Sequence, residues 1–321
     1  VPMVARYVAR ETRPWFLGRA RSTLRHLRSM GTRELTVDQL LDAAERAWAT
    51  HERLRALSLL DELLALERSH PRGLYLKANY LKEQGDVAEA LRTVQLAVTA
   101  APTDWRVQRL CGSLLWDKGR GTEALEAYDR ALKSEPTDPY TWYYKGYVLY
   151  RMERHDEALP CLDRALSLKS DAPSFHNQKG FCLERLERFE AAARCYRRSL
   201  RLNPGDLFTR EYLGQALQTC GQHEEALACF DAVLSASPGR EEALFRRASI
   251  LTSLERWEEG AATFARYLTL RTDSFNAWFN RGVCLRHLGR WQEAVVCFER
   301  AVHARPSSVS ARHQLDFCRR Q

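Results

Sequence analysis

The stretch that decides the fold is FNAWFNRGVCLRHLGRWQEAVVCFERAVHARPSS, residues 275–308. Small residues stand at Gly282 and Ala294, and the large ring of Phe298 follows one turn after the second of them. Apolar residues separated by three, four and seven positions are typical of amphipathic helices. Gly289 lies between the two apolar patterns, where a first helix has to end and turn. The stretch therefore predicts two helices that approach each other closely.

The same pattern recurs every 34 residues, and eight copies run from Val37 to Ser308 without an insertion or deletion. Such a period is typical of repeat proteins, in which each copy buries its apolar face only against its neighbours. The column of small residues consists of Ala44, Ala78, Gly112, Gly146, Gly180, Gly214, Ala248 and Gly282. The predicted repeats are residues 37–70, 71–104, 105–138, 139–172, 173–206, 207–240, 241–274 and 275–308.

Each copy resembles the tetratricopeptide repeat, a helical hairpin with a Trp-Leu-Gly-Tyr-Ala-Phe-Ala-Pro skeleton. The residues of the last copy that carry the resemblance are Trp278, Gly282, Leu285, Ala294, Phe298, Ala301 and Pro306. The resemblance implies an all-α, right-handed α-solenoid of about eight hairpins, whose first helices line a concave groove. The first copy is degenerate, because it keeps Ala44 and Ala56 but has no closing proline.

The two ends of the repeat array need caps, because the outermost hairpins have no neighbour on one side. Residues 309–321 are predicted to form one further helix that covers the C-terminal end. Residues 1–36 form a basic arm with eight arginines against two glutamates, out of a net charge of +8 for the whole chain. We expect this arm to be a helical cap. A basic amphipathic helix also binds anionic membranes, nucleic acids or partner proteins, and these alternatives stay open.

The composition excludes several other classes of protein. Apolar residues make up 45% of the 321 residues and charged residues 28%, too apolar a composition for a disordered chain. No window approaches eighteen uncharged apolar residues, and residues 1–30 lack the apolar stretch of a secretory signal. With an odd count of nine cysteines, we expect free thiols and a cytoplasmic location. Because the sequence begins at Val1 and not at Met, an upstream extension stays open.

The sequence contains no pattern typical of a catalytic or metal site. Cys161, Cys195 and Cys229 are one repeat apart, and no Cys-x-x-Cys pair exists, so packing explains the cysteines better than metal binding. No nucleophile elbow, glycine-rich phosphate loop or His-Glu-x-x-His motif is present. We therefore expect a protein that is not an enzyme and that uses neither a cofactor nor a metal.

A second stripe of aromatic residues lies beside the predicted core stripe. Tyr143, Tyr147 and Tyr150 follow helical spacing in residues 139–172, although the core positions there are already filled by other residues. The resemblance implies that this stripe faces the groove, with packing between repeats as the alternative. Arginine pairs with carboxylates, and tyrosine supplies rigid contact area. The predicted partner-binding residues are Arg106, Arg109, Trp116, Tyr140, Tyr143, Tyr147, Tyr150, Asn177, Phe181, Phe208, Tyr212 and Phe245.

The predicted function is a non-catalytic scaffold or adaptor that binds a peptide or protein segment in the groove. The alternatives are an anionic-surface binder acting through residues 1–36, and the regulatory module of a larger enzyme. The carboxylate clamp with which some family members bind chaperone C-terminal tails does not line up, because Tyr75 and Leu110 stand where lysine and asparagine are required. We do not expect chaperone tails as partners.

A run of arginines marks the predicted second helix of residues 173–206. Arg194, Arg197, Arg198 and Arg201 recur at helical spacing on that helix. Charged residues on amphipathic helices usually form a solvated face. We therefore expect these arginines to lie on the convex surface in contact with water.

Overall fold

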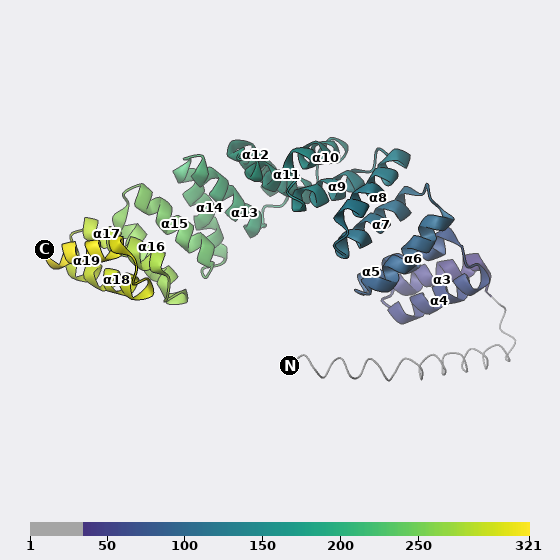
Figure 1. The fold of residues 1–321 in the computed structure, drawn as a ribbon, viewed down its shortest axis with the longest axis horizontal. Coiled ribbons are helices and arrows are strands. Elements are labelled where there is room, and N and C mark those ends of the chain that lie inside the picture. Colours follow the sequence, from purple (N-terminus) through teal and green to yellow (C-terminus); the bar gives the residue numbers. More distant parts are fainter. Residues whose placement is uncertain (1–34) are drawn as a thin grey trace, which may run out of the picture. The chain divides into compact units, whose positions relative to one another are not determined.

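A computed structural model describes residues 35–321, in which every regular element is an α-helix (Figure 1). The α-solenoid of helical hairpins predicted from the repeat period is thereby confirmed. No helix of this range is long and apolar enough to span a membrane. The predictions for the basic arm fall on residues 1–34 and lie outside the described residues, apart from Thr36, whose side chain caps the first described helix.

Two compact bodies make up the described chain, residues 35–114 and residues 115–321, and each is described by itself. Within each body, helices that follow one another in sequence pack together, as α9 does with α10 and α11 with α12. The helices of the first body are α3 (Val37–Ala49), α4 (Arg53–Leu66), α5 (Pro71–Glu83), α6 (Val87–Ala100) and most of α7 (Trp105–Asp117). Those of the second body are α8 (Gly121–Ser134), α9 (Pro139–Arg151), α10 (His155–Leu168), α11 (Pro173–Arg185), α12 (Phe189–Leu202), α13 (Leu207–Thr219), α14 (His223–Ala236), α15 (Glu241–Ser253), α16 (Trp257–Leu270), α17 (Phe275–His287), α18 (Trp291–Ala304) and α19 (Val309–Arg319).

The turn inside every hairpin passes through one residue with a positive φ angle, always at the same position of the repeat. Four copies place glycine there, at Gly85, Gly119, Gly221 and Gly289, with φ between 69° and 85°. The other four place His51, Glu153, Glu187 and Glu255 there, with φ between 57° and 63°. The left-handed conformation costs a residue with a β-carbon about 1–2 kcal/mol, so the hairpin geometry overrides local preference at these four positions.

Close packing explains the column of small residues. A β-carbon on Gly180 would lie 2.4 Å from Cε1 of Tyr196, and one on Gly214 would lie 2.9 Å from Cζ of Phe230. Both rings are fully buried. The second helix of each of these hairpins therefore approaches the first through a position that tolerates only glycine.

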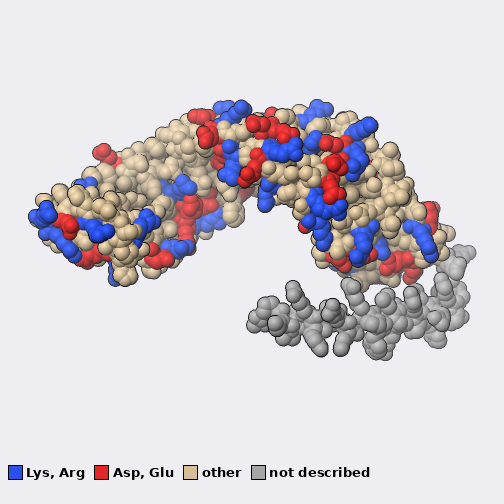
Figure 2. Space-filling model, viewed as in Figure 1, with Lys and Arg blue, Asp and Glu red and all other residues tan. Residues whose placement is uncertain are grey.

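Ion pairs between consecutive hairpins recur at one position of the repeat. In each pair an aspartate on one second helix meets a cation on the next first helix, with nitrogen–oxygen distances of 2.5 to 2.6 Å. The pairs are Lys77–Asp61, Lys145–Asp129, Lys179–Asp163 and Arg247–Asp231. Figure 2 shows the same balance of charge over α16–α19, where basic and acidic atoms lie side by side. Such partly exposed pairs contribute about 0–1 kcal/mol each.

Candidate partner-binding surface

The predicted partner-binding residues lie on first helices, and in the second body they come from α7, α9, α11, α13 and α15. We call the outer surface of α9, α11 and α13 the first-helix face. On α9 the Tyr147 ring meets Trp116 edge to face, with ring centroids 6.2 Å apart. The Tyr147 hydroxyl accepts a hydrogen bond of 2.9 Å from the Arg151 guanidinium. Both rings are half-buried, so each keeps surface available for contact.

Two aromatic side chains near the start of their helices are more exposed. Phe208 has 64% of its surface exposed and Tyr140 has 40%. The Arg240 guanidinium lies over the Phe208 ring, 4.3 Å from its centroid. Glu211 holds that guanidinium through two hydrogen bonds, one of them 2.8 Å long. An exposed ring beside an ordered cation is a typical anchor of a protein interface.

Four rings of the predicted stripe have one side committed to packing. Tyr143 stacks on Phe175 of the next repeat, with centroids 4.6 Å apart and planes 13° apart. Phe181 and Tyr212 meet edge to face at 4.7 Å, and both pack against buried residues of the second body. Phe245 contacts Phe264 at 5.8 Å. Each of these side chains can thus serve both packing between repeats and contact with a partner. Their partner-binding role stays a prediction.

A half-buried carboxyl group lies among the rings of α11. Burial raises the pKa of Glu184 to about 7, although the nearby Tyr196 hydroxyl and Arg185 lower it in part. The Tyr196 hydroxyl is itself buried and has no partner of good hydrogen-bond geometry within residues 35–321. Burial and the Glu184 charge raise its pKa far above the ordinary tyrosine value. The repeat pattern does not show the burial of Glu184, because it depends on Tyr196, a residue of the second helix of the same hairpin.

Amide side chains on the first-helix face have acceptor atoms without a partner. Asn177 donates from Nδ2 to the Thr209 hydroxyl at 2.7 Å, but its Oδ1 is buried and accepts no hydrogen bond from residues 35–321. Oε1 of Gln218 is likewise buried and accepts no hydrogen bond within the described chain. A buried acceptor without a donor is costly and usually has a functional or solvent partner. Both atoms are shielded from solvent, so a bound segment reaches them only after the side chains rotate.

Arg106 and Arg109 belong to the first body and are described within it. Both guanidinium groups lie over the Trp105 ring, at 5.2 Å and 4.9 Å from its centroid. Stacking of this kind restricts the orientation of an arginine side chain. Their predicted role, the anchoring of an acidic group, is compatible with this arrangement and stays a prediction.

The cysteines are free thiols, and all nine lie in the described chain. Burial raises the pKa of Cys182 and of Cys297 to about 11, so both stay protonated at neutral pH. Within residues 35–321, no three His, Cys, Asp or Glu side chains lie together in a way that could hold a metal ion.

Comparison with known protein families agrees with the geometry. The tetratricopeptide repeat family matches residues 41–104, 110–173, 145–206, 212–276 and 275–308. The chain belongs to the tetratricopeptide repeat family. Tetratricopeptide repeats are in general protein–protein interaction modules, and this fold generally binds protein or peptide partners. A search of curated proteins found no match.

Solved structures of other tetratricopeptide repeat proteins share the fold. YrrB, described as having an unusual peptide-binding site, is 21% identical, with a TM-score of 0.54 over 59% of this chain and 97% of its own. A tetratricopeptide repeat protein from Parabacteroides merdae is 14% identical, with a TM-score of 0.54 over 88% of this chain and 98% of its own. PilF from Pseudomonas aeruginosa is 16% identical, with a TM-score of 0.54 over 64% and 93%. At these identities the likeness shows the fold alone.

Proposed function

We propose that this tetratricopeptide repeat protein is a non-catalytic scaffold that binds an extended segment of a partner protein along the first-helix face. The observation that carries the proposal is the row of partly exposed rings on consecutive first helices, with Tyr147 on α9, Phe181 on α11 and Phe208 on α13. An extended peptide offers apolar side chains to these rings.

The chemistry of the face indicates what kind of segment fits. Tyr147, Phe181 and Phe208 supply aromatic contact area on three consecutive first helices. Glu184 adds a carboxyl group whose pKa of about 7 lets it accept a cation or donate a hydrogen bond as conditions change. A segment with an apolar middle and a neutral or basic end is complementary to this set.

The test is a titration of the partner, recovered from native extract with the wild-type protein, against three variants. Tyr147→Ala and Phe208→Ala remove rings of the first-helix face, and we expect Tyr147→Ala to weaken binding about 30-fold, or about 2 kcal/mol. Val296→Ala is the control, because Val296 is 52% exposed on the second helix α18. Circular dichroism melts of all proteins accompany the titration.

Two results would contradict the proposal. If Tyr147→Ala melts the protein, its ring is a packing residue and not a partner contact. If Tyr147→Ala and Phe208→Ala fold and bind as tightly as wild type, the partner uses another surface, the basic arm of residues 1–36 among them.

A further inference from the structure

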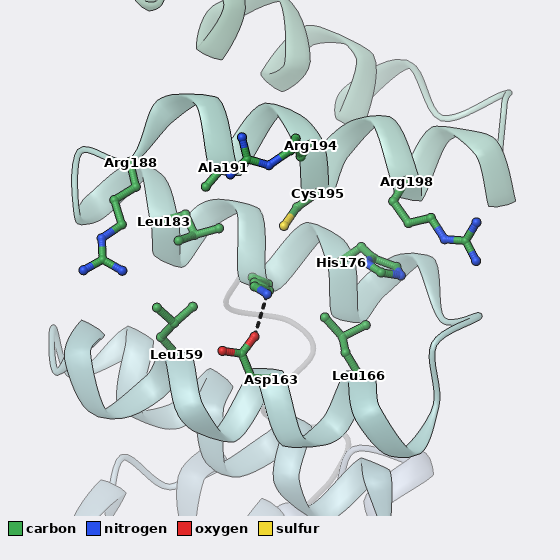
Figure 3. Close-up of a pocket in the computed structure, with 11 residues that line it drawn as sticks. Leu159, Asp163, Leu166, His176, Leu183, Arg188, Ala191, Arg194, Cys195 and Arg198 are labelled. Carbon is green, nitrogen blue, oxygen red and sulfur yellow. Dashed lines mark ion pairs between the residues drawn. The ribbon is translucent and has the colours of Figure 1, made fainter.

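An open cleft of about 510 Å³ lies between the second helices α10 and α12 (Figure 3). Its apolar lining consists of Leu159, Leu166, Leu183, Ala191 and Cys195, from α10, α11 and α12, and the Lys179–Asp163 ion pair lies in the same cleft. Of these, only Leu183 is fully buried, so a bound side chain can cover the rest. The cleft is lined mainly by second helices, and the α11 residues that line it are not the partner-binding residues Asn177 and Phe181 predicted on that helix.

Three arginines rim this cleft, namely Arg188, which is the N-cap residue of α12, and Arg194 and Arg198 of α12. Within residues 35–321 none of the three forms an ion pair, whereas Lys179 in the same cleft is paired with Asp163 at 2.6 Å. Arg188 and Arg198 lie at opposite ends of the cleft (Figure 3). Ten residues of α-helix separate them, which corresponds to about 15 Å along the helix axis.

The positive charge of the cleft is one cause of the lowered pKa of His176. Burial lowers the pKa of His176, and the charges of Arg198 and Lys179 lower it further, although a hydrogen bond to the Ser170 carbonyl opposes both effects. The sequence prediction placed Arg194 and Arg198 on a solvated outer face. In the structure Arg194 is exposed and Arg198 is half-buried, so both contact water, and both also border the cleft.

Comparison among the repeats shows that the positive charge arises from a missing glutamate. At the start of four second helices an arginine pairs with a glutamate three residues later, as in Arg120–Glu123, Arg154–Glu157, Arg256–Glu259 and Arg290–Glu293. The position of these glutamates is occupied by glutamate in six of the other seven repeats: Glu89, Glu123, Glu157, Glu225, Glu259 and Glu293. Only residues 173–206 place alanine there, at Ala191. Arg188 therefore lacks the partner that its counterparts have.

A second partner of Arg188 is lost in the same repeat. Arg290 also pairs with Glu258 of the preceding second helix, at 2.9 Å, and Arg256 approaches Glu224 at 3.7 Å. The residue that corresponds to these glutamates on α10 is Asp156, which is one methylene shorter. No ion pair joins Asp156 to Arg188 within the described chain. Both of the interactions that neutralise this arginine elsewhere are thus absent at one cleft.

We propose that the cleft between α10 and α12 binds an acidic amphipathic segment of a partner protein. Carboxylates of the segment pair with Arg188 and Arg198, and an apolar side chain between them covers Ala191 and the leucines of the lining. Guanidinium groups bind carboxylates through two parallel hydrogen bonds, which gives the contact a defined direction. The backbone positions of the two arginines are about 15 Å apart, a distance that about eleven residues of a helix or four to five residues of an extended chain span.

The test uses a fluorescein-labelled 14-residue helical peptide that has leucines along one face and glutamates flanking that face near both ends, measured by fluorescence anisotropy. Ala191→Glu restores the glutamate that other repeats have, and it is expected to weaken binding at least tenfold. Ala191→Gln adds the same volume without charge and is expected to weaken binding less than threefold. Arg198→Glu is expected to weaken binding at least tenfold and to reduce the salt dependence of binding.

Arg266→Glu is the matched control, because Arg266 occupies the position of Arg198 two repeats further along the chain, on α16. It is expected to leave peptide binding unchanged. Thermal melts of each variant identify any loss of folding, and Arg198→Glu replaces Ala191→Glu if the latter unfolds.

Three outcomes would overturn the proposal. The first is no measurable binding of the peptide to the wild-type protein. The second is equal binding by wild type and Ala191→Glu. The third is binding of a 12-nucleotide single-stranded DNA in place of the peptide, which would show that the cleft recognises phosphates.

Discussion

The Tyr196 ring crosses α11 directly over Gly180, so that its hydroxyl lies beside the Glu184 carboxyl one helical turn further on. A β-carbon on Gly180 would lie 2.4 Å from the ring. One glycine therefore permits both the close packing of the hairpin and the placement of a hydroxyl next to the acid of the first-helix face. The repeat pattern and the candidate site are linked at this contact.

Gly180→Ala is expected to destabilise the protein by about 1–3 kcal/mol, because the Tyr196 ring has to move away from the new methyl group. Urea unfolding followed by circular dichroism measures the change. Gly205→Ala is the control, since a β-carbon there would meet only the Asn203 side chain, at 4.0 Å. Equal unfolding midpoints for the two variants would contradict the close contact.

The positive-φ position of the hairpins predicts opposite effects for two substitutions. Glu187→Gly relieves a left-handed residue at φ 57° and is expected to stabilise the protein by about 0.5–1 kcal/mol. Gly221→Ala introduces a β-carbon at φ 74° and is expected to cost about 1 kcal/mol. Melting temperatures that shift in the same direction for both variants would show that the turn is not the cause.

The raised pKa of Glu184 predicts a pH-dependent stability. The folded protein holds this proton up to a pH of about 7, whereas the unfolded chain releases it near the ordinary 4.5. The native state binds more protons in this window, so the free energy of unfolding falls as the pH rises from about 4.5 to 7. After allowance for the partial exposure of the group, the loss is about 1 kcal/mol.

Glu184→Gln is expected to remove that dependence and to be more stable than wild type at pH 8 but not at pH 5. Gln218 already occupies the same position in the next repeat, so the amide is compatible with the fold. Denaturation at both pH values measures the effect, with Glu126→Gln on the exposed surface of α8 as control. An identical pH dependence in wild type and Glu184→Gln would contradict the assignment.

The helical architecture could be predicted because it depends on contacts within a short stretch. First helices α5, α9 and α11 begin at Pro71, Pro139 and Pro173, the first residues of predicted repeats. Proline suits the first turn of a helix, and the glycine and ring columns fix how the two helices of a hairpin meet. Each of these features recurs at a fixed position of the repeat, so it can be recognised by comparing one repeat with the next.

The roles of individual groove residues could not be predicted in the same way. Tyr143 and Phe175 are 32 residues apart and belong to different hairpins, so whether their rings stack depends on the angle between repeats. The position of Tyr143 in its own helix does not determine the angle between repeats. The cleft at Arg188 is different, because the missing glutamate at Ala191 is visible in the repeat columns, but its meaning depends on the ion pairs that the other repeats form.

Photo-crosslinking to the bound partner is the most direct test of whether the partner binds along the first-helix face. A benzoylphenylalanine at position 208 places the probe on the first-helix face, and the same residue at position 296 places it on a second helix of similar exposure. If the partner binds along the first-helix face, we expect a crosslink from position 208 and none above background from position 296. A crosslink from position 296 with none from position 208 would contradict it.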